Sequence, residues 1–337
     1  MTIPDDTKQA LYKNLGDETD AFLSHAARLL EKYANQWQLT NIEFMETNTV
    51  NLLFACDSAL YGACVLKVCI PGLETTTEIN CLRAYDGKGR RCSDGNWASS
   101  VTKNANEASR FGSSSTHLQA EQPYCRLLAY NLQDNILLLQ RVIPGSQMWE
   151  VADYKDRARH MAHLGKDLHI PWDGQTPYPT YLSWMERIHD TLSAMGNMDD
   201  MLFYLNKAMA VYAELKTRHT QNCLLHGDLH HENMLLNAQG SYTIIDPKGV
   251  VDAPVMETAR FLNNEIPCEP GRILEMVAIM SPIIGICEKD MLCSLFVDTA
   301  LSTCWSMEEH FPTQAAFEEA KREALADCQF AYELMTQ

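Results

Sequence analysis

Residues 223–249, CLLHGDLHHENMLLNAQGSYTIIDPKG, contain the pattern from which the rest of the chain is interpreted. Asp228 is followed five residues later by Asn233, and a second carboxylate, Asp246, ends an apolar run. The apolar residues after Asn233 and before Asp246 predict two strands, and the polar residues and glycine between them predict a tight turn. The stretch is therefore predicted to be a polar loop followed by a hairpin that ends in an aspartate.

This spacing is typical of the catalytic loop of a kinase. Transfer of a phosphoryl group from a nucleotide requires a carboxylate at the acceptor hydroxyl and oxygen ligands that hold magnesium on the phosphates. In that layout Asp228 is the base that orients the acceptor hydroxyl, while Asn233 and Asp246 bind the metal. We therefore predict ATP and Mg²⁺ as cofactors.

The segments HGDLHHEN (226–233) and IIDPKGVVDAP (244–254) resemble the aminoglycoside/hydroxyurea phosphotransferase family, of the streptomycin 6-kinase type, in the protein-kinase-like superfamily. Asp-Pro-Lys-Gly stands where protein kinases carry Asp-Phe-Gly, and Glu232 stands where the family usually has glycine. The resemblance implies a bilobal α+β fold with an antiparallel N-terminal lobe and a mainly helical C-terminal lobe. It also implies transfer of the γ-phosphoryl group of ATP to a hydroxyl of a small molecule.

The same stretch allows a hydrolase metal site as an alternative. Imidazole and carboxylate groups at such spacing are suitable metal ligands. The four candidate ligands are His226, Asp228, His230 and His231. This alternative gives no role to Asn233 or Asp246, so the kinase interpretation is favoured, and we expect His226 to shape the loop through hydrogen bonds to backbone.

A lysine within an apolar strand indicates a buried ion pair in the N-terminal lobe. Lys67 lies in the run ACVLKV at 63–68, where a buried charge is costly unless a counter-charge is present. The run is similar to the Val-Ala-Ile-Lys strand of kinases, whose lysine holds the nucleotide phosphates. Its predicted partner is Glu78, in a helix predicted for residues 73–85.

Two further segments are predicted to contact the nucleotide. Strands are predicted within 42–56 and 63–69, and the loop at 46–51 is the candidate phosphate loop although it lacks glycine. The side chains proposed to contact phosphate there are Thr47, Asn48 and Thr49. By resemblance, the hinge backbone that would hydrogen-bond the adenine edge is that of Gln140, Arg141 and Val142.

The predicted lobes are residues 1–143 and 144–337, because Pro144 and Gly145 would end the last strand of the first lobe. Residues 89–122 are rich in serine and lack apolar periodicity. They are predicted to be a flexible insertion that the family usually lacks. Beyond residue 152 the periodicity is helical.

Composition narrows the classes of molecule that the chain is expected to bind. The formal charge of −17 argues against nucleic-acid binding and favours a cationic partner, and no apolar segment predicts a signal peptide or membrane span. The twelve cysteines include no Cys-x-x-Cys pair, which favours free thiols in the cytoplasm. Protein partners are not predicted.

The predicted acceptor is a cationic, hydroxylated compound of the streptomycin type, so that the reaction would inactivate an antibiotic. Asp252, Glu265 and Glu269 are candidate carboxylates of a substrate cleft, with exposed surface acids as the alternative, and Glu257 is expected to brace the catalytic loop. Two other functions remain open: a metabolite kinase for a choline-like, sugar or amino alcohol acceptor, and a nucleotide-binding protein with weak catalysis.

Overall fold

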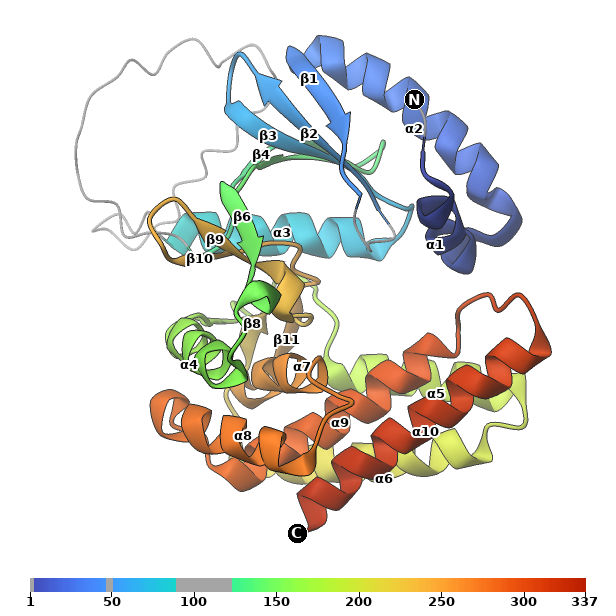
Figure 1. The fold of residues 1–337 in the computed structure, drawn as a ribbon, viewed down its shortest axis with the longest axis vertical. Coiled ribbons are helices and arrows are strands. Elements are labelled where there is room, and N and C mark those ends of the chain that lie inside the picture. The colour runs from blue at the N-terminus through green and yellow to red at the C-terminus, as the bar shows by residue number, and fades with distance from the viewer. Residues whose placement is uncertain (1–2, 47–50, 89–122) are drawn as a thin grey trace.

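The computed structural model describes residues 3–46, 51–88 and 123–337 (Figure 1). An antiparallel sheet with three helices forms the upper part of the molecule in Figure 1, and a mainly helical part lies below it. This confirms the predicted α+β architecture. The predicted phosphate loop residues Thr47, Asn48 and Thr49, and the predicted insertion at 89–122, lie outside the described residues.

The N-terminal sheet has five antiparallel strands in the order β1-β2-β3-β5-β4. Its strands are β1 (Leu39–Phe44), β2 (Leu52–Ser58), β3 (Gly62–Val68), β4 (Leu127–Asn131) and β5 (Ile136–Gln140). Its helices are α1 (Asp5–Leu15), α2 (Thr19–Gln36) and α3 (Leu73–Lys88). The residues predicted as strand within 42–56 thus belong to two strands, β1 and β2.

The side chains of β3 alternate between two environments. Leu66 packs with Phe54 and with Tyr33 of α2 in one apolar cluster. Because successive side chains of a strand point to opposite faces, Lys67 faces the other side of the sheet. There it meets Glu78 of α3, so the alternation in β3 places the predicted ion pair on the face that leads to the lower part of the molecule.

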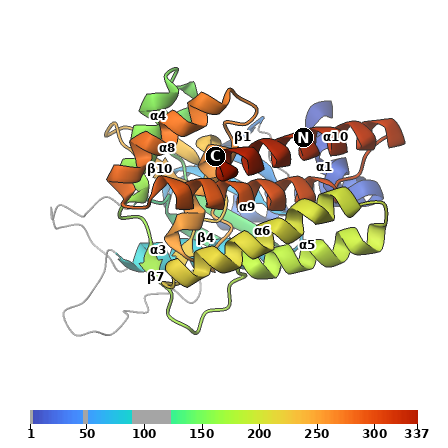
Figure 2. The same cartoon turned by 90° about the horizontal axis from the view of Figure 1, so that it is seen from below.

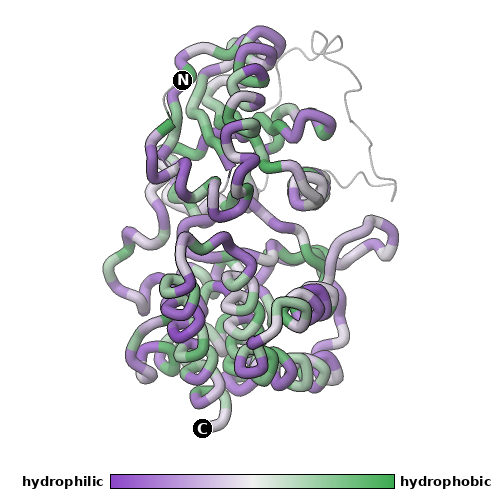
Figure 3. The backbone as a smooth tube through the Cα atoms, turned by 90° about the vertical axis from the view of Figure 1, so that its right-hand side faces the viewer, coloured by the Kyte–Doolittle hydropathy of each residue, from purple (hydrophilic) through white to green (hydrophobic). Residues whose placement is uncertain are grey.

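The lower part is built from long helices. They are α4 (Tyr154–Gly165), α5 (Tyr181–Met195), α6 (Asp199–Arg218), α7 (Glu257–Asn263), α8 (Pro270–Ile284), α9 (Glu288–Ser306) and α10 (Gln314–Thr336). Figure 2 shows α5, α6, α9 and α10 side by side. Helix α9 is buried along most of its length, so it forms the centre of this core, and apolar segments recur along these helices in Figure 3.

Local sequence signals explain where several helices begin and end. Asp153 and Thr313 accept hydrogen bonds from backbone N–H groups in the first turns of α4 and α10, as N-cap residues do. Gly285 ends α8 in a left-handed conformation. Helix α8 continues past Pro282 to Ile284. Pro282 lies in the last turn, and because it has no N–H it cannot donate to the carbonyl four residues earlier.

Two small sheets hold the connecting loop between them. One has the order β11-β8-β7 and the other has the order β10-β9-β6. The strands are β6 (Pro144–Gln147), β7 (Ile170–Pro171), β8 (Cys223–Leu225), β9 (Met234–Asn237), β10 (Tyr242–Ile244) and β11 (Val250–Asp252). Residues 226–233 connect β8 to β9, so the predicted catalytic loop is fixed at both ends by strand pairing.

Within the described residues, no single helix has the length and apolar character needed to cross a bilayer. Helices α8 and α9 would meet those criteria only as a pair, and they are bent by 117° where they join.

Candidate active site

The catalytic loop is held in place by its backbone. Glu257, the first residue of α7, accepts hydrogen bonds from the N–H groups of His226 at 2.6 Å and Gly227 at 3.1 Å. This confirms the predicted bracing role of Glu257. Gly227 has φ of +81°, and a Cβ atom there would lie 2.7 Å from Val250 Cγ1, so only glycine fits.

His226 shapes the loop, as predicted. Its Nδ1 accepts a hydrogen bond from the N–H of Asp228 at 3.0 Å, and its Nε2 therefore donates to the carbonyl of Ile245 at 2.8 Å. This arrangement requires a neutral imidazole. Burial lowers the pKa of His226, which favours the same neutral form.

Asp228 lies in this loop with 24% of its side chain exposed. Its backbone carbonyl accepts a hydrogen bond from Asn233 Nδ2 at 2.9 Å, so the amide oxygen of Asn233 is available to a cation. Ile245, next to Asp246, donates its N–H to the carbonyl of Asn233 at 3.0 Å. The three predicted residues of the phosphoryl-transfer motif are thus tied together by backbone contacts.

Asp246 follows β10 in the left-handed region, with φ of +57°. This conformation is uncommon outside glycine. The Asp246 carboxylate pairs with Lys67, whose Nζ also lies 2.8 Å from Glu78 Oε2. Lys67 is 4% exposed, so the predicted ion pair is present and buried, and Asp246 joins it from the lower part of the molecule.

Lys67 and Asp246 stabilise each other's charged forms, whereas burial raises the pKa of Glu78 to about 7. Burial acts to lower the pKa of Lys67, but the carboxylates of Asp246 and Glu78 raise it overall. Burial likewise acts to raise the pKa of Asp246, while Lys67 and Lys248 lower it overall. Lys67 therefore stays protonated and Asp246 ionised, as phosphate and metal binding require.

A cavity of about 340 Å³ adjoins this cluster. Lys67, Glu78, Asp246 and Lys248 line it, together with the backbone around Gly72 at the start of α3. Carboxylate and amide oxygens are the ligands that Mg²⁺ prefers, so Asp246 and Asn233 form a suitable donor set for that ion. Lys67 and Lys248 place positive charge at the wall of this cavity.

The hinge backbone is partly engaged in the sheet. The N–H of Gln140 donates to the carbonyl of Arg126 at 2.9 Å, and that of Arg141 donates to Ala63 at 3.2 Å. The N–H of Val142 makes no backbone hydrogen bond to any described residue. Of the three predicted hinge amides, that of Val142 is the one available to a nucleotide base.

The alternative metal site is not supported. Among residues 3–46, 51–88 and 123–337, no three His, Cys, Asp or Glu side chains lie close enough together to hold a metal ion. His231 instead stacks on Phe261 with ring centroids 4.2 Å apart, and it contacts Asn264 and Glu265.

Two of the three carboxylates that were predicted to line a substrate cleft are buried instead. Asp252 is buried and accepts hydrogen bonds from Tyr212 at 2.7 Å and Lys216 at 3.0 Å. Glu265 is also buried, and it accepts two hydrogen bonds from Arg157. Both the cleft prediction and its surface alternative are therefore wrong for Asp252 and Glu265, because protein cations already neutralise these carboxylates. Glu269 is exposed.

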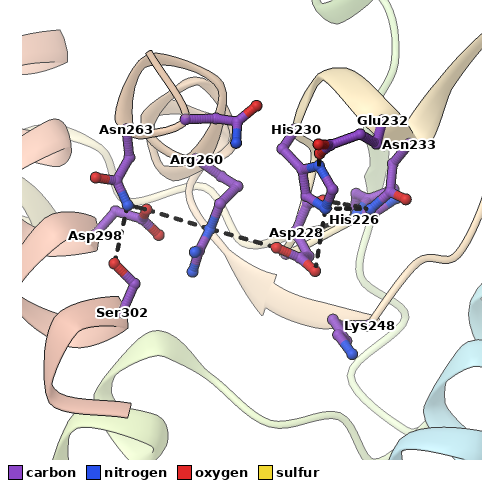
Figure 4. Close-up of polar contacts among 12 residues, drawn as sticks. His226, Asp228, His230, Glu232, Asn233, Lys248, Arg260, Asn263, Asp298 and Ser302 are labelled. Carbon is purple, nitrogen blue, oxygen red and sulfur yellow. Dashed lines mark hydrogen bonds and ion pairs between the residues drawn. The ribbon is translucent and has the colours of Figure 1, made fainter. Parts of the chain in front are cut away.

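Sequence reasoning missed the residue that faces Asp228. Arg260 lies one turn after Glu257 in α7, and its Nε is 3.5 Å from Asp228 Oδ1 (Figure 4). It also lies 3.3 Å from Asp298 Oδ2, in α9. Residues three apart share a helix face, so a helix braced against the loop by Glu257 also turns Arg260 toward it. The spacing of three residues between Glu257 and Arg260 is therefore the sequence signal that could have predicted Arg260 at the site.

Lys248 is a second residue of the site that is not predicted from the sequence. Its Nζ lies 2.8 Å from Glu74 of α3, so it links the loop after Asp246 to the N-terminal lobe. Burial acts to lower the pKa of Lys248, but Asp246 and Glu74 raise it overall. A protonated lysine therefore borders the phosphate side of the cavity.

The chain is similar in sequence to one family model and to two streptomycin kinases. The family model described as aminoglycoside/hydroxyurea antibiotic resistance kinase matches residues 93–310, which is more than half of the chain. Streptomycin 6-kinase of Streptomyces griseus is 22% identical over 260 residues, which cover 75% of this chain and 71% of that protein. Streptomycin 3''-kinase of Klebsiella pneumoniae is 29% identical over 109 residues, 30% of this chain, and only 41% of its own length is covered.

The fold is similar to that of a solved kinase. A choline/ethanolamine kinase family protein of Mesorhizobium loti superposes with a TM-score of 0.62 at 12% identity, over 93% of this chain and all of that chain. At this level of identity the likeness concerns the fold alone. The predicted protein-kinase-like fold is therefore confirmed.

Proposed function

The chain belongs to the aminoglycoside/hydroxyurea antibiotic resistance kinase family, and we propose that it transfers the γ-phosphoryl group of ATP to a hydroxyl of a cationic, hydroxylated acceptor of the streptomycin type. Membership makes it a phosphotransferase of the aminoglycoside kinase type. The identity of the acceptor is the further step, and it rests on the similarity to two streptomycin kinases and on charge.

One observation carries the proposed chemistry. Asp228 lies in a hydrogen-bonded loop with Asn233, whose Nδ2 donates to the backbone carbonyl of Asp228. The backbone carbonyl of Asn233 accepts a hydrogen bond from the N–H of Ile245, and the next residue, Asp246, pairs with the buried Lys67. Phosphoryl transfer needs these parts together: a carboxylate for the acceptor, metal ligands and a phosphate-binding lysine. Lys67 and Asp246 line one cavity, and the loop of Asp228 and Asn233 is joined to Asp246 through the hydrogen bond of Ile245.

In the proposed reaction, Lys67 contacts the nucleotide phosphates and Glu78 holds Lys67 in position. Asn233 and Asp246 bind Mg²⁺, which neutralises charge that develops on the phosphate oxygens. Asp228 accepts the proton of the acceptor hydroxyl as the new O–P bond forms and the bond to the β-phosphate oxygen of ATP breaks. ADP and a phosphate ester are the products.

The acidity of the chain supports a cationic acceptor. A net charge of −17 attracts a polycation over long range, and salt screens that attraction over about 8 Å at physiological ionic strength. The apparent affinity for such an acceptor should therefore weaken as salt is added. A neutral acceptor would show no such dependence.

The test is a panel of acceptors incubated with ATP and Mg²⁺. We expect mass spectrometry to find one phosphoryl group added to streptomycin, with a KM for streptomycin that rises with salt. Transfer to a choline-like, sugar or amino alcohol compound but not to streptomycin would replace the proposed acceptor with a metabolite. Nucleotide binding without transfer to any acceptor would contradict the proposal as a whole.

A further inference from the structure

Arg260 occupies an unusual position beside the catalytic loop. Its Nε lies between two carboxylates, 3.5 Å from Asp228 Oδ1 and 3.3 Å from Asp298 Oδ2 (Figure 4). The Asp298 side chain is fully buried, whereas that of Asp228 is 24% exposed. Arg260 thus joins a carboxylate in the core of the helical part to the carboxylate at which the acceptor would react.

The buried end of this arrangement is fixed by hydrogen bonds. Asn263 Nδ2 donates to Asp298 Oδ2 at 3.2 Å and to Ser302 Oγ at 2.9 Å, and Asn263 Oδ1 accepts from Thr299 at 3.0 Å. Tyr181 of α5 donates to Asp298 Oδ1 at 3.4 Å. Hydrogen bonds from Asn263 and Tyr181 therefore hold the Asp298 carboxylate in position beside the guanidinium group.

The terminal nitrogens of Arg260 have a different environment. In the described part of the chain, no residue accepts a hydrogen bond from Nη1 or Nη2 of Arg260. Its buried Nε also makes no hydrogen bond there, and its contacts with Asp228 and Asp298 are ion pairs. In Figure 4 both terminal nitrogens extend to one side of the line between the two carboxylates. A guanidinium is a planar fork of donors that suits oxygen acceptors, so two donors are available next to Asp228.

We propose that Arg260 positions the acceptor: its guanidinium forms an ion pair with the Asp228 carboxylate, and its Nη1 and Nη2 donate to an oxygen of the acceptor next to the hydroxyl that is phosphorylated. This inference rests on the proposed function and narrows its acceptor class. A vicinal diol offers one oxygen to Asp228 and its neighbour to Arg260. A simple amino alcohol with a single hydroxyl lacks the second oxygen.

The test compares variants of Arg260 in the full-length enzyme. Arg260→Gln removes the charge and the fork, and Arg260→Lys keeps the charge alone. Arg260→Gln combined with Asp298→Asn avoids leaving a buried carboxylate without its partner. Arg218→Gln is the matched control, because Arg218 also pairs with a carboxylate, Asp290 at 2.8 Å, at the far end of α6.

We expect Arg260→Gln to lower kcat/KM for a diol acceptor by about 10- to 100-fold, the effect of losing a charge-assisted hydrogen bond. The KM for ATP should stay near the wild-type value. Arg260→Lys should restore kcat more than KM, because the lysine keeps the positive charge beside Asp228 but not the two parallel donors. Arg218→Gln should behave as the wild type in both constants.

Two failures can be told apart. If the wild type transfers phosphate to no acceptor, the proposed function is wrong and this inference falls with it. If the wild type is active and Arg260→Gln has the same KM for the acceptor, only the inference is wrong. A double variant that folds and recovers the wild-type KM would also overturn it, since Arg260 would then serve only to neutralise Asp298.

Discussion

Two buried clusters, each of one cation between two acids, lie on either side of the proposed reaction. The nucleotide-side cluster is Lys67 between Glu78 and Asp246, and the acceptor-side cluster is Arg260 between Asp298 and Asp228. In each, one acid is almost completely buried and the other is about one quarter exposed, at 23% for Asp246 and 24% for Asp228. The exposed acid is in each case the one with a proposed chemical role.

The clusters differ in how the chain assembles them. Lys67 and Glu78 belong to the N-terminal sheet and its helix, whereas Asp246 comes from the lower part, so this cluster exists only when the two parts are in contact. The acceptor-side cluster is built entirely from the catalytic loop, α7 and α9. We infer that nucleotide binding depends on the relative position of the lobes, while the geometry around Asp228 does not.

The largest expected effect is on the acid that faces the acceptor. Asp228→Asn should lower kcat by about 10²- to 10⁴-fold, since a positioned general base typically contributes that much. Nucleotide affinity should change little, because the nucleotide-side cluster is intact. Isothermal titration with ATP and steady-state kinetics with the acceptor measure the two quantities.

The control is Asp246→Asn, which removes a proposed metal ligand instead. It should weaken Mg²⁺-dependent nucleotide binding itself. Full activity of Asp228→Asn would remove that residue from the mechanism, and unchanged Mg²⁺-dependent binding by Asp246→Asn would remove the metal assignment.

A second expected effect is on stability. Asp298→Ala removes the fully buried partner of Arg260, and breaking a buried ion pair by removing one partner typically costs about 3–5 kcal/mol. Urea unfolding should show this loss, while the affinity of the folded variant for ATP should remain near the wild-type value. A variant as stable as the wild type would show that Asp298 and Arg260 contribute no net stabilisation to the core.

The free energy of unfolding should depend on pH through protonation of His226, which contacts elements of both clusters. His226 hydrogen-bonds both Glu257, in the helix of Arg260, and Ile245, next to Asp246. Burial lowers its pKa in the folded state, so below the unfolded value of about 6.5 the unfolded chain binds a proton that the folded chain does not. This contribution to stability is present above about pH 6.5 and is lost as the pH falls.

The measurement is the free energy of unfolding between about pH 7.5 and 5.5. His226→Asn should flatten the dependence, whose slope from one group is at most about 1.4 kcal/mol per pH unit. His189→Asn is the control, because His189 lies in α5 with 34% of its side chain exposed. Equal slopes for wild type and His226→Asn would contradict the requirement for a neutral imidazole.

The smallest expected effect concerns the contact between the lobes. Lys248 and Glu74 form an ion pair in which the glutamate side chain is 70% exposed. Exposed pairs typically contribute less than about 1 kcal/mol, so Glu74→Gln should leave the free energy of unfolding nearly unchanged. A loss comparable to that of Asp298→Ala would show that contact between the lobes, rather than the core of the helical part, determines stability.

The sequence predicted the nucleotide-side cluster better than the acceptor-side cluster. Lys67 could be predicted because a lysine in an apolar strand needs a counter-charge. Asp246 could be predicted because it ends a motif within 27 consecutive residues, 223–249. Arg260 and Asp298 lie on separate helices, and no local pattern joins them. Their proximity depends on how α7 packs against α9.

Contacts between distant segments also explain why the predictions for two acidic residues are wrong. The cleft and surface predictions for Asp252 and Glu265 are wrong, because the sequence does not reveal that Lys216 of α6 and Arg157 of α4 reach them. The fold class and the family were predicted correctly, since both follow from the contiguous motif around Asp228 and its spacing to Asp246. The roles of the individual site residues, and the lobe boundary at residues 143 and 144, stay predictions.

The most direct test of the account is acceptor-dependent ADP formation by the wild type and Asp228→Asn, with streptomycin as acceptor and the product analysed by mass spectrometry. We expect the wild type to form ADP and a singly phosphorylated streptomycin in equal amounts. Asp228→Asn should bind ATP but form both products at a rate lower by about 10²-fold or more. Phosphorylation of streptomycin at the wild-type rate by Asp228→Asn would contradict the account.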